Sequence, residues 1–344
     1  MAILNRLWQQ LTQMNYVVVL SLSFIIICFG SVTIHLVEPD RFPTLFDGFW
    51  WTMTTLTTVG YGDYFPVSVP GRLLGVFLFI FGIGIIGVLI GKTVESVTIY
   101  QKLKREGKLM FRKKGHYVYI GWSKKTEQAM NEIFLHNPEA FIVLIEDMAH
   151  TPFEHEQVHF VQGDPSDEEV LMKANILEAL RVAIFADSRI ENPLLADGKT
   201  LLIASAVEAL SAEHQKDIQT VVEVCVEKHI SKFKHIRVDD FILSNDSVSL
   251  LMAKATLQPG TSNIFRQLMS KQFGNNIYTL SSNPNWLTYL EASQALLQKG
   301  AVLIAVNDDM DFKNATEKVL GPQDTLYFVC QETCYEELCF LYNK

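Results

Sequence analysis

Residues 44–66 read TLFDGFWWTMTTLTTVGYGDYFP, and this stretch decides the fold of the first part of the chain. Apolar side chains recur at helical spacing from Phe46 to Leu56, which predicts a short helix over residues 46–57. Such a helix is too short to cross a bilayer, so we expect it to be re-entrant. A non-helical stretch that follows it at membrane depth must be buried in protein or line a cavity.

The non-helical stretch after this helix covers residues 58–63 and reads TVGYGD. Two glycines separated by one residue, Gly60 and Gly62, allow left-handed backbone conformations, so successive carbonyl groups can point the same way. Four such strands around one axis would form rings of carbonyl oxygens able to replace the hydration shell of an ion. The residue types therefore indicate an ion-coordinating loop.

Two long apolar runs flank this loop. Residues 16–37 read YVVVLSLSFIIICFGSVTIHLV and carry no formal charge, and residues 73–90 read LLGVFLFIFGIGIIGVLI. Each run is long enough to cross a bilayer as a helix. A signal peptide is the alternative for the first run, but its start lacks a basic cluster and no small-residue cleavage site follows it. We therefore expect two membrane spans in a lipid bilayer.

Basic residues gather on one side of these runs. Only Arg6 precedes the first run, whereas the second is followed by Lys92, Lys102, Lys104, Arg105, Lys108, Arg112, Lys113 and Lys114. The positive-inside rule then predicts that both termini, and everything after the second run, lie in the cytoplasm of a cell-membrane protein. The segment between the two runs would face outside.

The overall composition excludes several classes of protein. The formal net charge is −9, from 29 Lys and Arg against 38 Asp and Glu, so we expect no nucleic-acid partner. A hydrophobic content of 49% is too high for a disordered chain. The five cysteines include no CxxC pair, which argues against a disulfide framework or structural zinc.

After residue 115 the pattern changes to short apolar runs that alternate with helix-like segments. The predicted strands cover residues 117–120, 141–145, 158–161, 182–185 and 219–226, and the predicted helices cover 124–134, 170–180 and 200–210, with a further helical stretch from 246 to about 270. This alternation is typical of a doubly wound parallel sheet. Gly121 after the first strand and Glu146 at the end of the second match the ground plan of a dinucleotide-binding fold.

The glycine fingerprint of that fold is incomplete. Residues 121–126 read GWSKKT, so only Gly121 is present, and the backbone lacks the later glycines that let it approach a pyrophosphate. Catalytic use of NAD is therefore not expected. Regulatory nucleotide binding is weakened but stays open, with Gly121, Ser123, Glu146 and Asp164 as candidate ligand-binding residues.

Residues 58–62 are identical to the selectivity filter of K⁺ channels, and they follow a pore-helix pattern between two spans. The chain thus resembles the two-span K⁺ channels, which implies a homotetrameric pore for K⁺. The resemblance assigns the coordinating carbonyls to Thr58, Val59, Gly60 and Tyr61, with the Thr58 hydroxyl at the inner site and Gly62 completing the filter. Tyr61 argues against the related non-selective pores, which depart from the pattern there.

The same resemblance assigns supporting roles. Trp51 resembles the position whose indole N–H bonds Asp63 and braces the filter from behind. Gly82 or Gly84 resembles the gating hinge of the second span, and close helix packing is the alternative role for these glycines. Many such pores carry a glutamate where this chain has Thr54, so inactivation coupled to that carboxylate is not carried over. Neither span carries regularly spaced arginines, so no voltage sensor is expected.

The rest of the chain resembles the regulator-of-K⁺-conductance (RCK) domain. Three motifs carry this resemblance, GWS at residues 121–123, GDP at 163–165 and KANI at 173–176, and the first recurs in archaeal calcium-gated K⁺ channels. Residues near the end of the chain resemble the small carboxyl-terminal lobe of that family, and they cover 276–278, 301–306 and 321–329. The family forms an octameric ring of such domains under one tetrameric pore.

The resemblance implies a fold class and a domain order. We expect a membrane α-helical pore, with two spans and a re-entrant pore helix, followed by a cytoplasmic α/β Rossmann-like RCK domain and a small α+β lobe. The boundaries are a pore domain at 1–97, a linker at 98–115, a Rossmann-like lobe at 116–258, and a crossover helix with the carboxyl-terminal lobe at 259–344.

The gating ligand is left open between Ca²⁺ and a nucleotide. Calcium prefers several carboxylates, and in calcium-gated relatives these follow the fourth and fifth strands. The matching positions here offer Asp187, displaced by one residue, and Glu227, while Cys225 stands where a second acid would be.

The overall expectation is a ligand-gated K⁺ channel and not an enzyme. A membrane-tethered, nucleotide-dependent oxidoreductase is the alternative. The intact filter sequence favours the channel, and the single-glycine turn disfavours the oxidoreductase.

Overall fold

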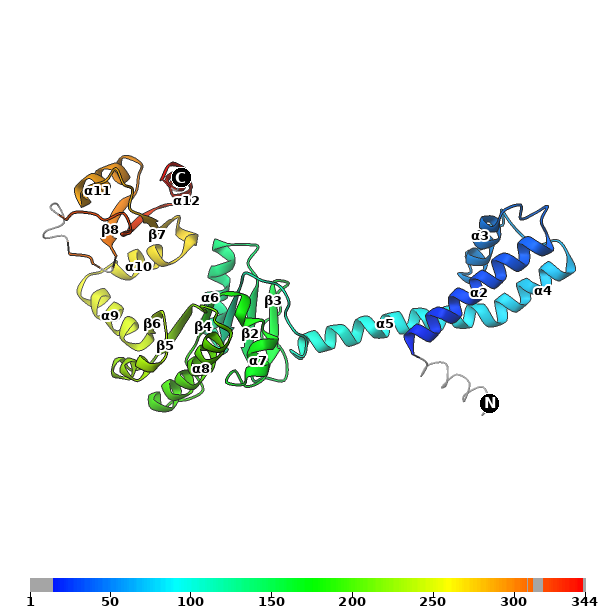
Figure 1. Ribbon diagram of the computed structural model, residues 1–344, viewed down its shortest axis with the longest axis horizontal. Helices are drawn as coiled ribbons and strands as arrows, with labels where there is room; N and C mark the ends of the chain where they lie inside the picture. Colours follow the sequence, from blue (N-terminus) through cyan, green and yellow to red (C-terminus); the bar gives the residue numbers. More distant parts are fainter. Residues whose placement is uncertain (1–14, 308, 312–317, 343–344) are drawn as a thin grey trace. The chain divides into compact units, whose positions relative to one another are not determined.

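The computed structural model describes residues 15–307, 309–311 and 318–342 (Figure 1). The chain divides into two compact units, Met1–Leu103 and Lys104–Lys344. The first unit carries the predicted spans and the filter loop, and the second carries the alternating strands and helices.

The first unit is entirely helical apart from its loops. Its elements are α2 (Tyr16–Val37), α3 (Leu45–Leu56), α4 (Val69–Phe77), the π-helical turn η1 (Leu78–Gly82) and α5 (Ile83–Arg105). Within the residues that the structure describes, two helices are long and apolar enough to cross a membrane, Tyr16–Val37 and the continuous helix Val69–Arg105. The two apolar runs are therefore confirmed as helices, and the short predicted helix is confirmed as α3.

Helix α3 is fixed at its start and packed along its length. Thr44 and Asp47 form a capping box, in which each side chain accepts a hydrogen bond from the backbone of the other residue. On the packed side, Trp51 and Leu56 join a buried cluster with Ile34 of α2. A residue larger than glycine at position 48 would place its Cβ 2.5 Å from the carbonyl oxygen of Ser31, so Gly48 lets the two helices approach closely.

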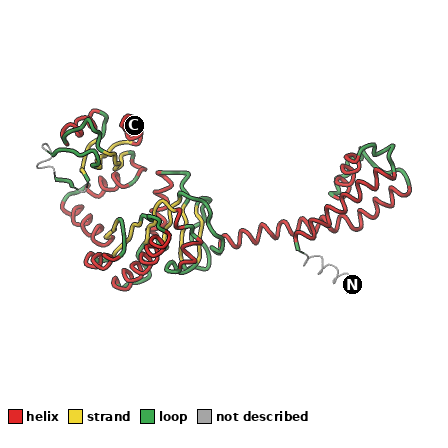
Figure 2. Tube along the Cα trace, in the orientation of Figure 1, coloured by secondary structure: helices red, strands yellow, loops and turns green. Residues whose placement is uncertain are grey.

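The second unit begins with a six-stranded parallel sheet in the order β3-β2-β1-β4-β5-β6. Its strands are β1 (His116–Ile120), β2 (Ile142–Glu146), β3 (Val158–Gln162), β4 (Ala179–Ile184), β5 (Thr220–Val224) and β6 (Asp240–Leu243). The connecting helices are α6 (Lys124–His136), α7 (Glu168–Lys173) and α8 (Pro193–His214), with short 3₁₀ turns η2 (Ile176–Glu178) and η3 (Glu227–His235). Figure 2 shows this alternation, which confirms the doubly wound α/β prediction.

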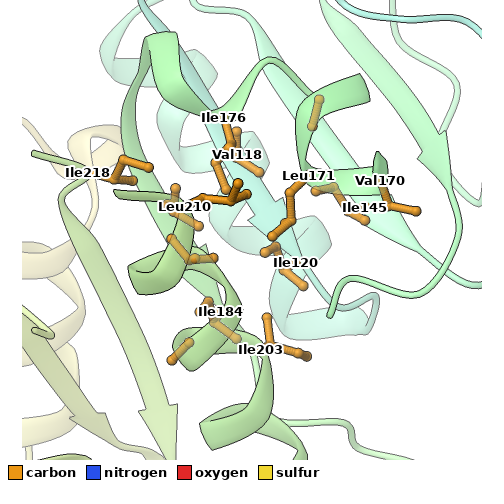
Figure 3. Close-up of a cluster of buried hydrophobic side chains, with 14 of the residues drawn as sticks. Val118, Ile120, Ile145, Val170, Leu171, Ile176, Ile184, Ile203, Leu210 and Ile218 are labelled. Atoms are coloured by element: carbon orange, nitrogen blue, oxygen red, sulfur yellow. The ribbon is translucent and has the colours of Figure 1, made fainter. Parts of the chain in front are cut away.

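Hydrophobic side chains fill both faces of this sheet. On one face, Val118 and Ile120 of β1 pack with Leu171 of α7 and Ile203 of α8 in a fully apolar cluster (Figure 3). On the other face, a second cluster includes Met130 of α6. Alternate residues of a strand point to opposite faces, so both faces of β1 need apolar residues and its sequence is a continuous apolar run.

Local backbone chemistry shifts several predicted boundaries. The helix expected over 170–180 ends at Lys173, because Asn175 adopts a left-handed conformation with φ 54° and β4 begins soon afterwards. The helical stretch expected from residue 246 divides into α9 (Ser244–Leu257) and α10 (Thr261–Met269), because Gly260 has a φ of 96°. Strand β6 was not predicted.

A small antiparallel sheet completes the second unit. It has the order β7-β9-β8, from β7 (Asn275–Ser281), β8 (Val302–Val306) and β9 (Thr325–Gln331). The 3₁₀ turn η4 (Lys271–Phe273) leads into it, and α11 (Tyr289–Gln298) and α12 (Glu332–Tyr342) pack beside it. This is the α+β lobe that the sequence predicted.

Candidate functional site: the filter loop and the sheet edge

The filter loop is tied directly to the end of the pore helix α3. The carbonyl oxygen of Thr54 accepts hydrogen bonds from the backbone N–H groups of Val59, at 2.9 Å, and Gly60, at 3.1 Å. The chain therefore turns back sharply after α3. The Thr54 hydroxyl itself donates to the carbonyl oxygen of Trp51, at 3.1 Å, so it stays within its own helix.

Backbone conformation alternates along the loop. Thr58, Gly60 and Gly62 have positive φ values of 61°, 55° and 78°, whereas the residues between them do not. Alternating handedness of this kind allows successive carbonyl groups to point to one side, which the predicted ion-coordinating loop requires. Thr58 is β-branched, and a left-handed conformation costs such a residue roughly 1–3 kcal/mol. This strain is concentrated at the first filter residue.

The tryptophan that braces the loop is Trp50, and the expectation of Trp51 is wrong. The indole Nε1 of Trp50 donates to Oδ2 of Asp63 over 2.8 Å. The Trp50 ring also stacks on Tyr61, with centroids 5.7 Å apart and ring planes within 5°. Trp51 instead points into the helix cluster, where it meets Phe42 edge-to-face at 5.6 Å. The two tryptophans are adjacent, so they lie on different sides of α3.

Glu38 is a functional candidate that the sequence analysis missed. Its carboxylate lies at the end of α2 and accepts hydrogen bonds from the backbone N–H groups of Val67 and Ser68, at 3.0 and 2.8 Å, and from the Ser68 hydroxyl. It is 7% exposed. Ser68 caps α4, so Glu38 joins the end of the first span to the start of the second. These partners lie some thirty residues away, and no local sequence signal marks them.

The two candidate hinge glycines differ in their surroundings. A Cβ atom on Gly82 would lie 2.1 Å from Cδ2 of Leu56, so Gly82 serves close packing against the end of α3. At Gly84 no heavy atom of the chain lies within 4 Å of such a Cβ. Gly82 also ends the π-helical turn η1, and π-helical turns are frequent at functional sites.

At the carboxyl edge of the large sheet, the Glu146 carboxylate already accepts hydrogen bonds from other groups of this chain. It is 5% exposed, and its carboxylate accepts the backbone N–H of Trp122 at 2.7 Å and the guanidinium of Arg189 at 3.0 Å. A pyrophosphate in a dinucleotide fold would need the N–H groups at this start of α6. The turn at Gly121, with φ 95°, approaches the backbone of Phe185 on its other side.

Asp187 is neutralised by two cations. Its carboxylate accepts Arg189 through Nε and Nη2, each at 2.8 Å, and Lys199 Nζ at 2.7 Å. The Arg189 guanidinium and, after it, Lys199 hold the pKa of Asp187 far below its usual range, against the opposing effect of burial. Arg189 thus bridges Asp187 and Glu146, and the cavity left beside them has a volume of only about 10 Å³. The side chains at this edge therefore leave little room for a nucleotide.

The remaining edge candidates serve local structure. Ser123 caps α6 by accepting from the N–H of Thr126 at 3.4 Å. The Asp164 carboxylate accepts the N–H and the hydroxyl of Ser166, at 2.9 and 2.8 Å, and these bonds lower its pKa.

The expected pair of calcium ligands is not assembled. Glu227 is exposed at the start of η3, whereas Asp187 is held by Arg189 and Lys199. Among residues 15–307, 309–311 and 318–342, no group of three or more His, Cys, Asp and Glu side chains could hold a metal ion.

Buried carboxylates near the fifth strand were missed in the sequence. Glu223 accepts the N–H of Ala186 at 3.0 Å and pairs with Lys125. Asp197 is 3% exposed and accepts the N–H of Cys225 at 2.7 Å. The apolar residues beside Glu223 and Asp197 in the sequence were the only indication that these two carboxylates are buried.

Comparison with known proteins matches both units. A profile described as ion channel matches residues 21–98, and a profile described as calcium-activated potassium channel slowpoke-like RCK domain matches residues 123–238. YugO of Bacillus subtilis, named as a potassium channel protein, is 28% identical over 66% of this chain and 68% of its own length. TvoK of Thermoplasma volcanium, named as a calcium-gated potassium channel, is 29% identical over 75% of this chain and 74% of its own.

One solved structure shows a similar fold over part of this chain. The gating ring of human SLO3 covers 64% of this chain and 45% of that chain, with a TM-score of 0.50 at 12% identity. The GsuK channel bound to NAD covers 94% of this chain and 58% of that chain, with a TM-score of 0.46 at 16% identity. The match spans less than two thirds of either solved chain. An ion-channel pore and an RCK domain are thus matched in tandem, and the chain is similar to potassium channels of this kind over two thirds to three quarters of its length.

Proposed function

We propose that this chain is one subunit of a K⁺-selective channel whose opening is controlled by a ligand at its RCK domain. The observation that carries the proposal is the backbone of residues 58–62. Its alternating handedness and its two hydrogen bonds to Thr54 support a row of carbonyl oxygens on one side of the loop. One chain supplies one such row, and K⁺ coordination needs rings of carbonyls, so four subunits form the proposed pore.

The proposed filter keeps the residue assignments made from the sequence, with one change. Thr58, Val59, Gly60 and Tyr61 supply the carbonyls, and Trp50 replaces Trp51 as the brace of Asp63. The basic residues after the second span support a cytoplasmic location for both termini and the RCK domain.

The exposed helices of the second unit support a ring of RCK domains. Helix α9 has no buried residue, and its Leu250 and Leu257 are 69% and 78% exposed. Apolar side chains at such exposure are typical of a surface that another subunit covers. We propose the octameric ring expected from the resemblance as the assembly that covers them.

The proposed ligand is Ca²⁺, with a nucleotide as the second candidate. TvoK, a relative over three quarters of this chain, is named as calcium-gated. The closed edge around Arg189 and the capped N–H of Trp122 disfavour a nucleotide there, and they equally disfavour the oxidoreductase alternative. Glu227 is an exposed carboxylate near the end of β5 and stays the first candidate ligand.

The proposal is tested by K⁺ flux from liposomes that contain the purified full chain. We expect a Ba²⁺-blocked K⁺ flux that Ca²⁺ on the cytoplasmic side increases, and we expect Glu227→Gln to shift this response to higher Ca²⁺. Glu213→Gln, a substitution of another exposed glutamate on α8, serves as the control. A flux indifferent to Ca²⁺ but changed by ADP or NAD would assign the nucleotide instead. No Ba²⁺-blocked flux under any of these conditions would contradict the channel itself.

A further inference from the structure

The chain leaves the second span as a strap that lies on the Rossmann-like lobe. We define this strap as residues 105–115, which follow the pore-side helix α5 directly. Its backbone carbonyls accept hydrogen bonds from the lobe at regular intervals. The Thr151 N–H donates a hydrogen bond to the carbonyl oxygen of Arg105 over 2.8 Å. The Gln162 N–H donates to the carbonyl oxygen of Gly107 over 3.1 Å. The strap is therefore docked along its length, although beyond Arg105, the last residue of α5, it has no regular secondary structure.

Further contacts hold the middle and the end of the strap. The Phe111 N–H donates to the carbonyl oxygen of Lys173 at 2.8 Å, and the Gly115 N–H donates to that of Glu178 at 2.9 Å. This docked segment is the covalent link between the two units, so a movement of the lobe can reach the pore through it. Its docking free energy would then affect how well ligand binding couples to opening.

Two histidines of the lobe lie beneath the strap, on either side of Phe111. The His159 ring donates through Nε2 to the carbonyl of Leu109 in the strap, at 2.8 Å. The His116 ring donates through Nε2 to the carbonyl of Ala174, at 3.0 Å. The Phe111 ring contacts both, with centroids 4.6 Å from His116 and 5.3 Å from His159.

The surroundings of His116 stabilise only the neutral form of its ring. The His116 side chain is fully buried. Its Nε2 carries the proton, because this nitrogen bonds a carbonyl oxygen, which can only accept. Nδ1 is therefore the unprotonated nitrogen. Nδ1 is buried and has no hydrogen-bond partner. Protonation would place a buried N–H there without an acceptor and a positive charge without a counter-ion, and both are costly.

The charges around the pair oppose protonation as well. The charge of His159 opposes protonation of His116, and Lys104, near the end of α5, opposes protonation of His159. The uncharged ring of Phe111 contacts both rings, and each ring donates to a backbone carbonyl. Burial is the main cause that lowers the pKa of both histidines.

We propose that the His116–His159 pair is a proton-sensitive catch, which docks the strap at neutral pH and releases it when the cytoplasm becomes acidic. The inference rests on the proposed channel function for its physiological meaning, but the docking itself does not depend on conduction. Burial lowers the pKa of both histidines, and the strap supplies part of that burial through Phe111 and Leu109, so the docked state is fully stable above the ordinary value of 6.5 and loses stability as the pH falls below it.

Hydrogen exchange of the full-length tetramer tests the catch without using current. Protection of the amides in residues 105–116 is compared at pH 7.5 and 5.5, after correction for intrinsic exchange rates, with β2 as the internal reference. Each histidine can weaken docking by up to about tenfold per pH unit below its ordinary pKa. We expect a roughly tenfold loss of protection in the strap and no change in β2. Unchanged protection in the strap at pH 5.5 would overturn the proposal.

Variants separate titration from packing. The double substitution His116→Gln and His159→Gln keeps amide donors but removes both titrating rings, so the loss of protection between pH 7.5 and 5.5 should fall below about twofold. His235→Gln, a substitution of an exposed histidine in η3, should behave as the wild type. If His116→Gln prevents assembly, His159→Gln alone should reduce the loss to roughly threefold. A full tenfold loss in either glutamine variant would contradict the assignment.

Channel recordings show whether the catch matters for gating. Lowering the cytoplasmic pH from 7.5 to 5.5 should reduce the Ca²⁺-evoked change in open probability at least threefold, and the glutamine variants should keep it. If the protein conducts no K⁺, the proposed function fails while the exchange result still stands. If it conducts but the strap stays protected in acid, only the catch fails.

Discussion

At the scale of single residues, long-range hydrogen bonds hold the filter loop and its surroundings. Trp50 reaches Asp63, thirteen residues along the chain, and Glu38 reaches the start of α4, about thirty residues along. Thr54 contacts the loop through its backbone carbonyl. Many related pores carry a glutamate at this position, and the Thr54 side chain does not replace that carboxylate. The Trp50–Asp63 bond therefore carries more of the restraint on this loop.

The substitution Trp50→Phe tests this restraint. It keeps an aromatic ring to stack on Tyr61 but removes the N–H donor to Asp63. A hydrogen bond to a charged acceptor contributes about 1.5–3 kcal/mol, which corresponds to roughly a tenfold to hundredfold shift in the balance between the intact and the distorted loop. We expect K⁺ currents in bilayers to decay faster during maintained opening by a factor in this range.

The neighbouring substitution Trp51→Phe is the matched control. Trp51 packs against Phe42 inside the helix cluster, so its replacement should leave the decay of the current unchanged. A faster decay with Trp51→Phe and a normal decay with Trp50→Phe would reverse our assignment of the brace.

The sequence indicated the filter residues but not all of their partners. The filter residues 58–62 could be predicted because the glycine spacing and the pore-helix pattern are local in the sequence. The choice between Trp50 and Trp51 could not be predicted, because it depends on which side of α3 meets a loop thirteen residues away. Arg189 was missed for the same reason, because its partner Glu146 lies on another strand.

At the scale of elements, the second span is one continuous helix with an irregular turn inside it. The turn η1 lies between α4 and α5, and Gly82 at its end packs against Leu56 of the pore helix. Gly84 lies two residues beyond the end of this turn, where no atom outside its own stretch of helix lies within 4 Å of an added Cβ in the described part of the chain. Packing thus accounts for Gly82, and bending is the role left for Gly84.

Alanine substitutions distinguish these two roles. Gly82→Ala places a methyl group against Leu56, and overpacking of this kind costs about 1–3 kcal/mol. We expect a lower unfolding temperature of the purified protein in detergent. Gly84→Ala meets no heavy atom of its own chain and favours a straight helix by about 1 kcal/mol. We expect it to keep the unfolding temperature and to lower the open probability. The opposite pattern would make Gly82 the hinge.

At the scale of the whole molecule, the unit that carries the two apolar spans and the unit that carries the two sheets are joined by a single segment. The resemblance placed a linker at 98–115, and the structure shows what it consists of, the end of α5 followed by the docked strap. No sequence pattern indicated the docking, because backbone carbonyls make most of its contacts. A ligand-driven movement of the Rossmann-like lobe would reach the pore through this strap.

The central claim is that the carbonyls of residues 58–62 select K⁺. The most direct measurement is the reversal potential of single channels formed by the purified full chain, in a bilayer with K⁺ on one side and Na⁺ on the other. We predict a reversal potential close to the equilibrium potential of K⁺, and we predict loss of selective current in Gly60→Ala, because the φ of 55° at this position disfavours a side chain. A reversal potential near zero in the wild type, or an unchanged selective current in Gly60→Ala, would contradict the account.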